Sequence, residues 1–352
     1  MTNYLITGGA GFIGTNFVRF LRAKKARDRV VVLDALTYAG NRANLDGVPD
    51  IMFVLGDIRD FDLVKQLLVD LQIDTLVHFA AETHVDRSIS APDIFIESNI
   101  VGTHTLLKAA KAVWLDTVGG KPHRFHHVST DEVFGSLEPD EPPCSETARY
   151  RPNSPYAASK AAADHLVRAY HRTFGLQTTI SYCTNNYGPH QFREKFIPLL
   201  LTNALQGKSM PIYGDGMNLR DWLYVEDHCR AIMLVLALGR AGEAYNIASG
   251  MALSNNVVAA ALCKAIDAAF QTDGRLAERF PHAAPALGRP TSTLTAFVSD
   301  RPGHDRRYSI DTTKIAAELG FKPKCTFAAG LAATLDWYLA NEVWWHAVAG
   351  QR

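Results

Sequence analysis

A glycine-rich turn near the start of the chain most restricts how this chain can fold. Residues 4–7 read as an apolar strand, and glycines then follow at three-residue spacing, as Gly8, Gly11 and Gly14. Such a turn lets a pyrophosphate approach the backbone at a helix N-terminus, where N–H groups and the helix dipole bind an anion. Asp34, 20 residues after Gly14, can accept hydrogen bonds from both ribose hydroxyls and would repel a 2′-phosphate. The sequence therefore predicts a dinucleotide site that favours NAD over NADP.

Strand and helix patterns alternate through the first half of the chain. Amphipathic stretches separate most of the apolar runs, and one of them spans residues 99–114. Near-continuous apolar strands between helices are typical of a parallel sheet covered on both faces. We therefore expect an α/β fold, with a Rossmann-type doubly wound parallel sheet. The expected strands are 4–7, 30–33, 52–55, 75–79, 125–129 and 178–182.

After about Asn185 the rhythm changes, because proline and glycine become dense. Residues 244–247 look like one more strand of the main sheet, 280–299 like an irregular loop, and 312–345 like helix. These patterns predict a smaller C-terminal substrate domain that is interleaved with the first domain. The predicted boundaries are 1–185 plus about 220–250 for the NAD-binding domain, and 186–219 plus 251–352 for the substrate domain.

The charges of the chain are balanced, with 36 Lys and Arg against 36 Asp and Glu. No net field attracts nucleic acid or an anionic membrane, so neither is an expected partner. The first residues read as a strand rather than a signal peptide, and the longest apolar stretch, 231–238, is too short to span a bilayer. Five cysteines without metal-ligand spacing predict free thiols, a cytoplasmic location and no bound metal.

A second motif, Ser154-Pro155-Tyr156-Ala157-Ala158-Ser159-Lys160, has the pattern of a helix start. Ser154 is a favourable N-cap and Pro155 is favourable at the first helical position. Tyr156 and Lys160 are then one turn apart on the same face. A nearby ammonium favours the anion of a phenol and lowers its pKa. The pair therefore predicts a tyrosine base for hydride chemistry, with Lys160 also able to hold the cofactor ribose.

Longer motifs carry a resemblance to a known family. Residues 79–88 (FAAETHVDRS), 129–135 (STDEVFG) and 185–189 (NNYGP) stand out, with supporting stretches at 34–41, 194–199, 220–222 and 300–305. On these motifs the chain resembles the extended short-chain dehydrogenase/reductases that act on nucleotide-sugars, and among them the dTDP-glucose 4,6-dehydratases. The resemblance extends over nearly the whole chain. It implies an NAD-dependent lyase whose substrate is dTDP-glucose.

The resemblance also implies catalytic roles for five residues. Tyr156, next to Lys160, would take the C4-hydroxyl proton while hydride leaves C4, and Thr130 would hydrogen-bond the C4 oxygen. Glu132 would remove the C5 proton, and Asp131 would protonate the departing C6 hydroxyl. Asp131 must then be neutral when substrate arrives, and adjacent carboxylates in a closed site can have their pKa values pushed apart in this way.

The binding residues follow from the same motifs. The resemblance assigns Asn186 to the cofactor side, Asn185 to the diphosphate, Arg220 and Arg301 to a diphosphate clamp, and Tyr213 to stacking on the base. The expected cofactor-binding set is Gly8, Gly11, Phe12, Ile13, Gly14, Asp34, Leu36, Thr37, Asp57, Ile58, Ala80, Ala81, Tyr156, Lys160 and Asn186. The expected substrate-binding set is Thr83, Ser88, Thr130, Asn185, Lys195, Pro211, Tyr213, Arg220, Asn255 and Arg301.

The chain departs from the family pattern at two places. Phe134 stands where the family commonly has Tyr, and Phe192-Arg193 replaces an aromatic-Pro pair. Three alternatives remain open: a sugar-nucleotide 4-epimerase or UDP-sugar 4,6-dehydratase, a decarboxylase of the same superfamily, and an NAD-bound sensor without turnover. An epimerase does not need the Asp131–Glu132 pair, and a sensor is expected to have lost Tyr156 or Lys160. The superfamily also implies a homodimer, formed through helices 99–114 and 156–174.

Overall fold

A seven-stranded parallel sheet forms the centre of the computed structural model, which describes residues 1–117 and 121–349. The chain runs from β1 outward through β2 and β3, and then returns to continue from β4 on the other side of β1. This reversal leaves a crevice beyond the carboxyl ends of β1 and β4, where doubly wound sheets bind ligands. Across the sheet the strands are β10 (Ala244–Ile247), β6 (Thr178–Cys183), β5 (Arg124–Thr130), β4 (Thr75–His78), β1 (Asn3–Thr7), β2 (Arg29–Asp34) and β3 (Ile51–Leu55).

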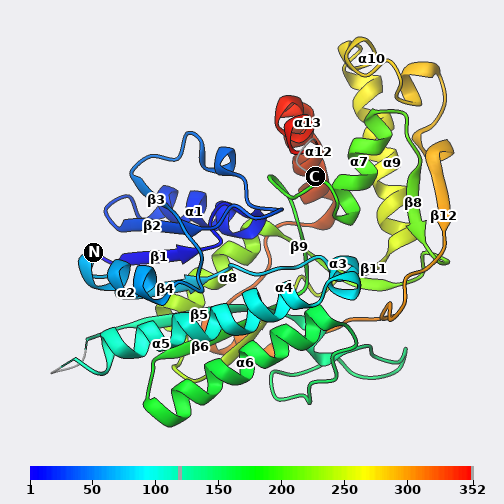
Figure 1. Ribbon diagram of the computed structural model, residues 1–352. Coiled ribbons are helices and arrows are strands. Elements are labelled where there is room, and N and C mark those ends of the chain that lie inside the picture. Colours follow the sequence, from blue (N-terminus) through cyan, green and yellow to red (C-terminus); the bar gives the residue numbers. More distant parts are fainter. Residues whose placement is uncertain (118–120, 350–352) are drawn as a thin grey trace.

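Helices cover both faces of this sheet (Figure 1). Each layer of helices buries an apolar cluster against the strands. This burial of apolar surface is the main contribution to the stability of a doubly wound sheet. One face carries α2 (Phe61–Asp70), α5 (Thr103–Trp114) and α6 (Pro155–Phe174), and the other carries α1 (Phe12–Lys24), α8 (Val225–Leu238) and α11 (Thr313–Leu319). The predicted fold class is therefore confirmed, and so is the return of 244–247 to the sheet next to β6.

Two segments differ from the sequence expectation. The predicted helix 99–114 begins with the π-helical turn Ile96–Gly102 before α5 starts. The prediction of an irregular loop at 280–299 is wrong at its end, because β12 (Thr295–Val298) pairs in parallel with β8 (Met210–Tyr213). The partner strand is distant in sequence, so local composition could not reveal the hydrogen bonds that order this segment.

The C-terminal lobe packs around a third apolar cluster. Its small sheet joins β7 (Asn185–Tyr187), β9 (Leu219–Tyr224) and β11 (Ala252–Ser254). The other helices after β7 are α7 (Phe196–Leu205), α9 (Asn255–Thr272), α10 (Arg275–Arg279), α12 (Phe327–Ala340) and α13 (Glu342–Ala349). Between β4 and the π-helical turn lie α3 (Val85–Ser90) and α4 (Asp93–Phe95). No helix within the described ranges combines the length and apolar character that crossing a bilayer requires.

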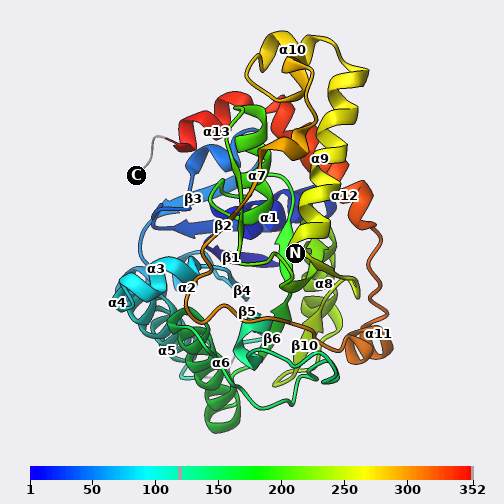
Figure 2. The ribbon, with the colours of Figure 1, turned by 90° about the vertical axis from the view of Figure 1, so that its right-hand side faces the viewer.

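The C-terminal helix α13 returns toward the central sheet, and Figure 2 shows it on the same side of the molecule as β2 and β3. Trp344 Nε1 donates to Asn44 Oδ1 at 2.7 Å, in the 3₁₀ turn Arg42–Leu45. Asn44 in turn donates through Nδ2 to the carbonyl oxygen of Ala10 at 2.8 Å. The end of the chain is thereby connected to the glycine-rich turn.

Candidate active site

The glycine-rich turn connects β1 to α1 and is packed backbone against backbone. Gly8 has φ +70°, and a Cβ there would lie 2.5 Å from the nitrogen of Ala80. A Cβ on Gly14 would lie 2.2 Å from the carbonyl oxygen of Gly8. Gly11 is the N-cap of α1 and offers no side chain to the first N–H groups. The turn therefore leaves helix N–H groups accessible to an anion, which fits a dinucleotide pyrophosphate.

Asp34 is held beside this turn at the end of β2. Its Oδ2 accepts from the Ala10 N–H and its Oδ1 accepts from the Leu36 N–H, each at 2.8 Å. Burial raises the pKa of Asp34, and these two hydrogen bonds oppose the rise. Each oxygen keeps a further lone pair for a ribose hydroxyl. Asp34 lines a small cavity together with seven other residues predicted for the cofactor: Gly8, Gly11, Thr37, Asp57, Ile58, Ala80 and Ala81.

Asp57 is already paired within this small cavity. Its carboxylate contacts the guanidinium of Arg59 at 2.7 Å, and that pairing holds the pKa of Asp57 below its ordinary value. Leu36, whose φ is +51°, does not line either cavity. Its backbone N–H donates a hydrogen bond to Asp34 and so helps to hold that carboxylate in place.

A larger cavity adjoins the small one and contains the predicted catalytic residues. The two cavities share Gly8, Gly11, Ala39, Phe79 and Ala81. Fifteen predicted residues line the larger cavity: Gly8, Gly11, Phe12, Ile13, Gly14, Ala81, Thr83, Thr130, Asp131, Glu132, Tyr156, Lys160, Asn185, Asn186 and Lys195. The carboxyl ends of β1, β4 and β5 and the start of α6 meet there, as expected for the crevice of a doubly wound sheet.

Tyr156 and Lys160 occupy the first turns of α6. Ser154 caps this helix by accepting from the Ala157 N–H, and Pro155 occupies the first position, as predicted. Lys160 Nζ donates to the carbonyl oxygen of Val128 at 2.9 Å. Burial, opposed by Asp164, lowers the pKa of Lys160 to about 8.

The expected lowering of the Tyr156 pKa does not occur. Burial and then the Glu132 carboxylate raise the pKa of Tyr156 well above its ordinary value, although a hydrogen bond with Thr130 opposes this. Desolvation disfavours the phenolate, and Lys160 is not among the main influences on its pKa. Sequence spacing indicated the proximity of the two side chains but not the depth of their burial.

Asp131 and Glu132 follow β5 directly, in the 3₁₀ turn Asp131–Phe134. Burial and then Glu132 raise the pKa of Asp131 well above its ordinary value, and the neighbouring Arg220 opposes this. Burial also raises the pKa of Glu132, but Arg301, Arg220 and Lys195 oppose it. Within the described residues, Asp131 Oδ2 is buried without a hydrogen-bond partner. The pair therefore offers a protonated acid and a base surrounded by cations, in one cavity.

Arg301 and Tyr213 share the carboxylate of Asp86. Arg301 Nη1 lies 3.2 Å from Asp86 Oδ1, and the Tyr213 hydroxyl lies 3.4 Å from Asp86 Oδ2. Neither residue lines the two cavities, and the same holds for Pro211, Arg220, Asn255 and Ser88. Arg220 is buried: it donates to the carbonyl oxygen of Asp305 at 2.7 Å and stacks on the Tyr308 ring.

Further residues line the cavities without having been predicted from the sequence. They are Ala39, Phe79, Val128, Ser129, Cys183, Thr184, Gln191 and Phe192 in the larger cavity and Leu33, Ala35, Tyr38, Ala39, Gly40, Gly56, Phe79, Glu82 and Ser98 in the smaller one. Several of them lie inside the stretches 34–41, 79–88 and 129–135 that carried the family resemblance. The position of these motifs at strand ends could have identified them.

Comparisons with known proteins match the geometry. A family model described as GDP-mannose 4,6 dehydratase matches residues 5–334. A dTDP-glucose 4,6-dehydratase of Xanthomonas campestris pv. campestris (strain B100) is 50% identical over 349 residues, covering 98% of this chain and 95% of the relative. The chain belongs to the dTDP-glucose 4,6-dehydratase family. A solved dTDP-glucose 4,6-dehydratase from Streptomyces venezuelae, with NAD and dTDP bound, superposes with a TM-score of 0.85 at 48% identity, covering 99% of this chain and 100% of that one.

The likeness to an epimerase is weaker in sequence. UDP-glucose 4-epimerase of Thermotoga maritima, solved with UDP-glucose, has a TM-score of 0.81 at 26% identity, covering 97% of this chain and 100% of that chain. Phe134, which departs from the dTDP-glucose 4,6-dehydratase family pattern, lines neither cavity, and its buried ring packs on Tyr150 and Tyr182. Phe192 does line the larger cavity and contacts the Tyr38 ring edge-on at 5.9 Å.

Proposed function

We propose that this enzyme is a lyase that converts dTDP-glucose into dTDP-4-keto-6-deoxyglucose and water. The observation that carries this proposal is the placement of Asp131 and Glu132 in the same cavity as Tyr156 and Lys160. Oxidation alone needs only Tyr156 and Lys160. Elimination across C5–C6 also needs an acid and a base, and the electrostatics of the pair fit that division. The relatives named dTDP-glucose 4,6-dehydratase support the choice of substrate.

NAD fits the glycine-rich turn and the small cavity. We assign it the predicted cofactor residues, with the pyrophosphate at the start of α1 and a ribose at Asp34. When bound, NAD supplies reversible hydride chemistry, taking hydride from C4 and returning it to C6. Because the same hydride serves both half-reactions, we expect NAD to stay tightly held between turnovers. The NAD-bound family structure supports this assignment.

Three side chains then divide the proton transfers. Tyr156 takes the proton of the C4 hydroxyl, and Thr130 hydrogen-bonds the same oxygen. The resulting ketone acidifies C5, so that Glu132 can remove the C5 proton. Asp131 delivers its proton to the departing C6 hydroxyl, which leaves as water. Glu132 would return a proton to C5 when hydride adds to C6, and exchange of that proton with solvent would place deuterium at C5. The unpartnered, buried Oδ2 of Asp131 is available to that hydroxyl.

The substrate's nucleotide half lies, in this proposal, toward the C-terminal lobe. Arg220 and Arg301 hold the diphosphate, since both lie close enough to Glu132 to oppose its pKa shift. Tyr213, 38% exposed on β8, is free to stack on the base. Lys195 lines the cavity and is tied to the Thr83 carbonyl oxygen at 3.0 Å. Asn185, Ser88, Pro211 and Asn255 complete the proposed substrate set.

Incubation with dTDP-glucose in deuterated water tests the proposed reaction. We expect a 4-keto-6-deoxy product with deuterium at C5 and the original C4 hydrogen at C6, detected by NMR. A parallel incubation with UDP-glucose measures the base preference. A C4-inverted sugar as the only product would show a 4-epimerase instead.

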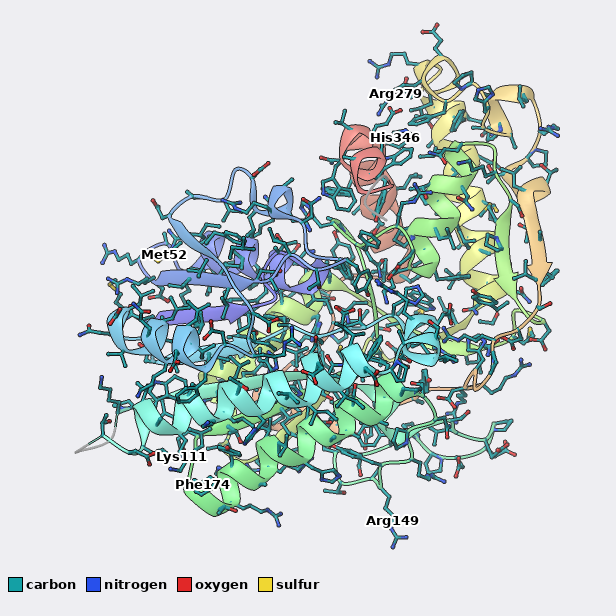
Figure 3. All side chains as sticks on the ribbon, in the orientation of Figure 1. Met52, Lys111, Arg149, Phe174, Arg279 and His346 are labelled. Carbon is teal, nitrogen blue, oxygen red and sulfur yellow. The ribbon has the colours of Figure 1, made fainter. Side chains whose placement is uncertain are left out.

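We also propose a cytoplasmic homodimer with the two-domain division predicted from the sequence. All five cysteines are free thiols, which supports a reducing compartment. Apolar side chains beside α5 and α6 are exposed: Ile94, Ile96, Val101 and Phe174 are 40–49% accessible. Figure 3 shows Lys111 near the C-terminal end of α5 and Phe174 at the C-terminal end of α6. Lys111 Nζ lies 5.2 Å from the Phe174 ring centre. Light scattering coupled to gel filtration measures the mass, and a monomer at micromolar concentration would contradict the dimer.

A further inference from the structure

A buried group of ionisable side chains lies behind Lys160. Asp164 follows Lys160 by one turn of α6, and its side chain has no exposed surface. Its Oδ2 accepts hydrogen bonds from Ser129 Oγ at 2.9 Å and from the Tyr150 hydroxyl at 3.1 Å. Two hydroxyl donors on one oxygen stabilise the ionised carboxylate. Asp164 is absent from the lining of both cavities, and none of the roles above uses it.

His127 on β5 lies between this carboxylate and Lys160. Its Nε2 lies 3.3 Å from Lys160 Nζ and 3.3 Å from Asp164 Oδ1. The two charges are therefore separated by no more than the sum of these distances. Burial lowers the pKa of His127 well below its ordinary value, so the ring is neutral. One nitrogen cannot accept a proton from Lys160 and donate one to Asp164 at the same time, so the three groups titrate as a set.

We propose that Asp164 is a positioning residue whose buried charge keeps Lys160 an ammonium beside Tyr156, a role that rests on the proposed function. Burial favours the neutral amine, which could not stabilise the Tyr156 phenolate. The pKa of Lys160 falls to about 8 even with Asp164 opposing the fall. Among the described residues that influence Lys160, Asp164 is the carboxylate that opposes the fall of its pKa. The other titratable groups around the Lys160–Asp164 pair are His78 on β4, His127 on β5, Tyr182 and Cys183 on β6, Tyr150 before α6, and Tyr156 and Arg168 on α6.

The test measures the titration of Lys160 in the D164N variant. Trace acetylation with acetic anhydride across pH, read by mass spectrometry, gives the midpoint for Lys160, with the exposed Lys208 as internal reference. Removing an opposite charge at this range should lower the midpoint by about 1–3 pH units. The ammonium is lost as pH rises through its pKa, so the alkaline limb of kcat should move to lower pH equally. D164E keeps the charge and should restore both values, and Y150F removes only a hydroxyl donor and should shift them less.

Failure of this inference is distinguishable from failure of the proposed function. An unchanged Lys160 midpoint in folded D164N overturns the inference even if turnover falls, whereas a lowered midpoint supports it whatever reaction the enzyme performs. If D164N does not fold, the double variant K160M/D164N shows whether the unpaired charge of Lys160 is the cause. Recovery of folding shows that the lost partner charge was the cause, because removing both charges leaves none uncompensated. A double variant as unstable as D164N overturns the pairing.

Discussion

Asp131 and Glu132 are adjacent in the chain but have different electrostatic surroundings. Three cations, Arg301, Arg220 and Lys195, oppose the effect of burial on Glu132. For Asp131, Arg220 and a hydrogen bond from Thr130 oppose the rise in pKa, while Glu132 itself adds to it. Protonation of Asp131 therefore costs less free energy than protonation of Glu132. The order of their proton affinities follows from where the arginines lie, not from the two acids themselves.

The first prediction at this scale concerns the variant D131N. An amide cannot deliver a proton to the C6 hydroxyl, so elimination should slow by about 100-fold or more, while oxidation at C4 is less affected. Deuterium at C4 of the substrate should then have little effect on kcat, because its transfer no longer limits turnover. Equal slowing of oxidation and elimination would contradict the acid role.

The second prediction concerns the acid limb of kcat. Glu132 must be ionised to act as a base, and its pKa is raised, so activity should fall as pH drops through a value above the ordinary 4.5. Arg301 is the largest influence opposing that rise, so R301M should move the acid limb to higher pH. The matched control is R306M, which removes an arginine paired on the surface with Asp215 at 2.7 Å. A shift of the same size in both variants would exclude a local effect of Arg301.

The grouping of the proposed reactive residues in one cavity could be predicted from the sequence, but the direction of the Tyr156 pKa shift could not. One-turn spacing placed Tyr156 and Lys160 on one helix face, and the structure confirms this. The direction of the Tyr156 pKa shift depends on burial by distant segments, which spacing does not report. His127 escaped notice for a related reason, because only the packing of β5 against α6 brings it to Lys160. The one-turn spacing of Asp164 from Lys160 was readable from the sequence, but its burial beside His127 was not.

At the scale of elements, the β1–α1 turn depends on backbone contacts that leave no room for a side chain. A Cβ at Gly14 would overlap the Gly8 carbonyl oxygen, which is a fixed part of the turn. G14A should therefore lose stability by about 1–3 kcal/mol, which outweighs the roughly 1 kcal/mol that alanine gains in a helix. Thermal unfolding measures the loss of stability, and NAD titration measures the affinity of the altered turn for the cofactor.

The control for this substitution is G274A. A Cβ at Gly274 meets nothing within 4 Å, and its φ is −59°. Its stability should therefore change by no more than about 0.5 kcal/mol. If both variants lose similar stability, then the turn is not restricted by close backbone packing.

Elements of the central sheet were predictable because their apolar runs are continuous and buried on both faces. The short strands of the C-terminal lobe were harder to predict from the sequence. β12 pairs with β8, whose residues precede it by more than 80 positions, and its Thr-Ala-Phe-Val sequence is too short to show a period. The proposed substrate residues on these elements, such as Pro211 and Tyr213, rest on the family motif alone.

At the scale of the whole molecule, the last helix reinforces the cofactor turn. Trp344 donates to Asn44, which donates to the Ala10 carbonyl oxygen. W344F removes the indole N–H and should cost about 1 kcal/mol, and it should also weaken NAD binding several-fold. V343A is the matched control, since Val343 lies on the same helix and is 85% exposed. Indistinguishable melting temperatures and NAD affinities in the two variants would refute the connection.

The position of β10 has a consequence for how the protein is made. β6 ends at Cys183, and the strand that covers its open edge starts only at Ala244. At about 5–20 residues per second, a translating ribosome leaves that edge unpaired for roughly 3–12 seconds. An unpaired strand edge is a template for association with other chains. The nascent chain should therefore be most dependent on chaperones in this interval, and ribosome stalling between the two strands should favour aggregation more than stalling after residue 247.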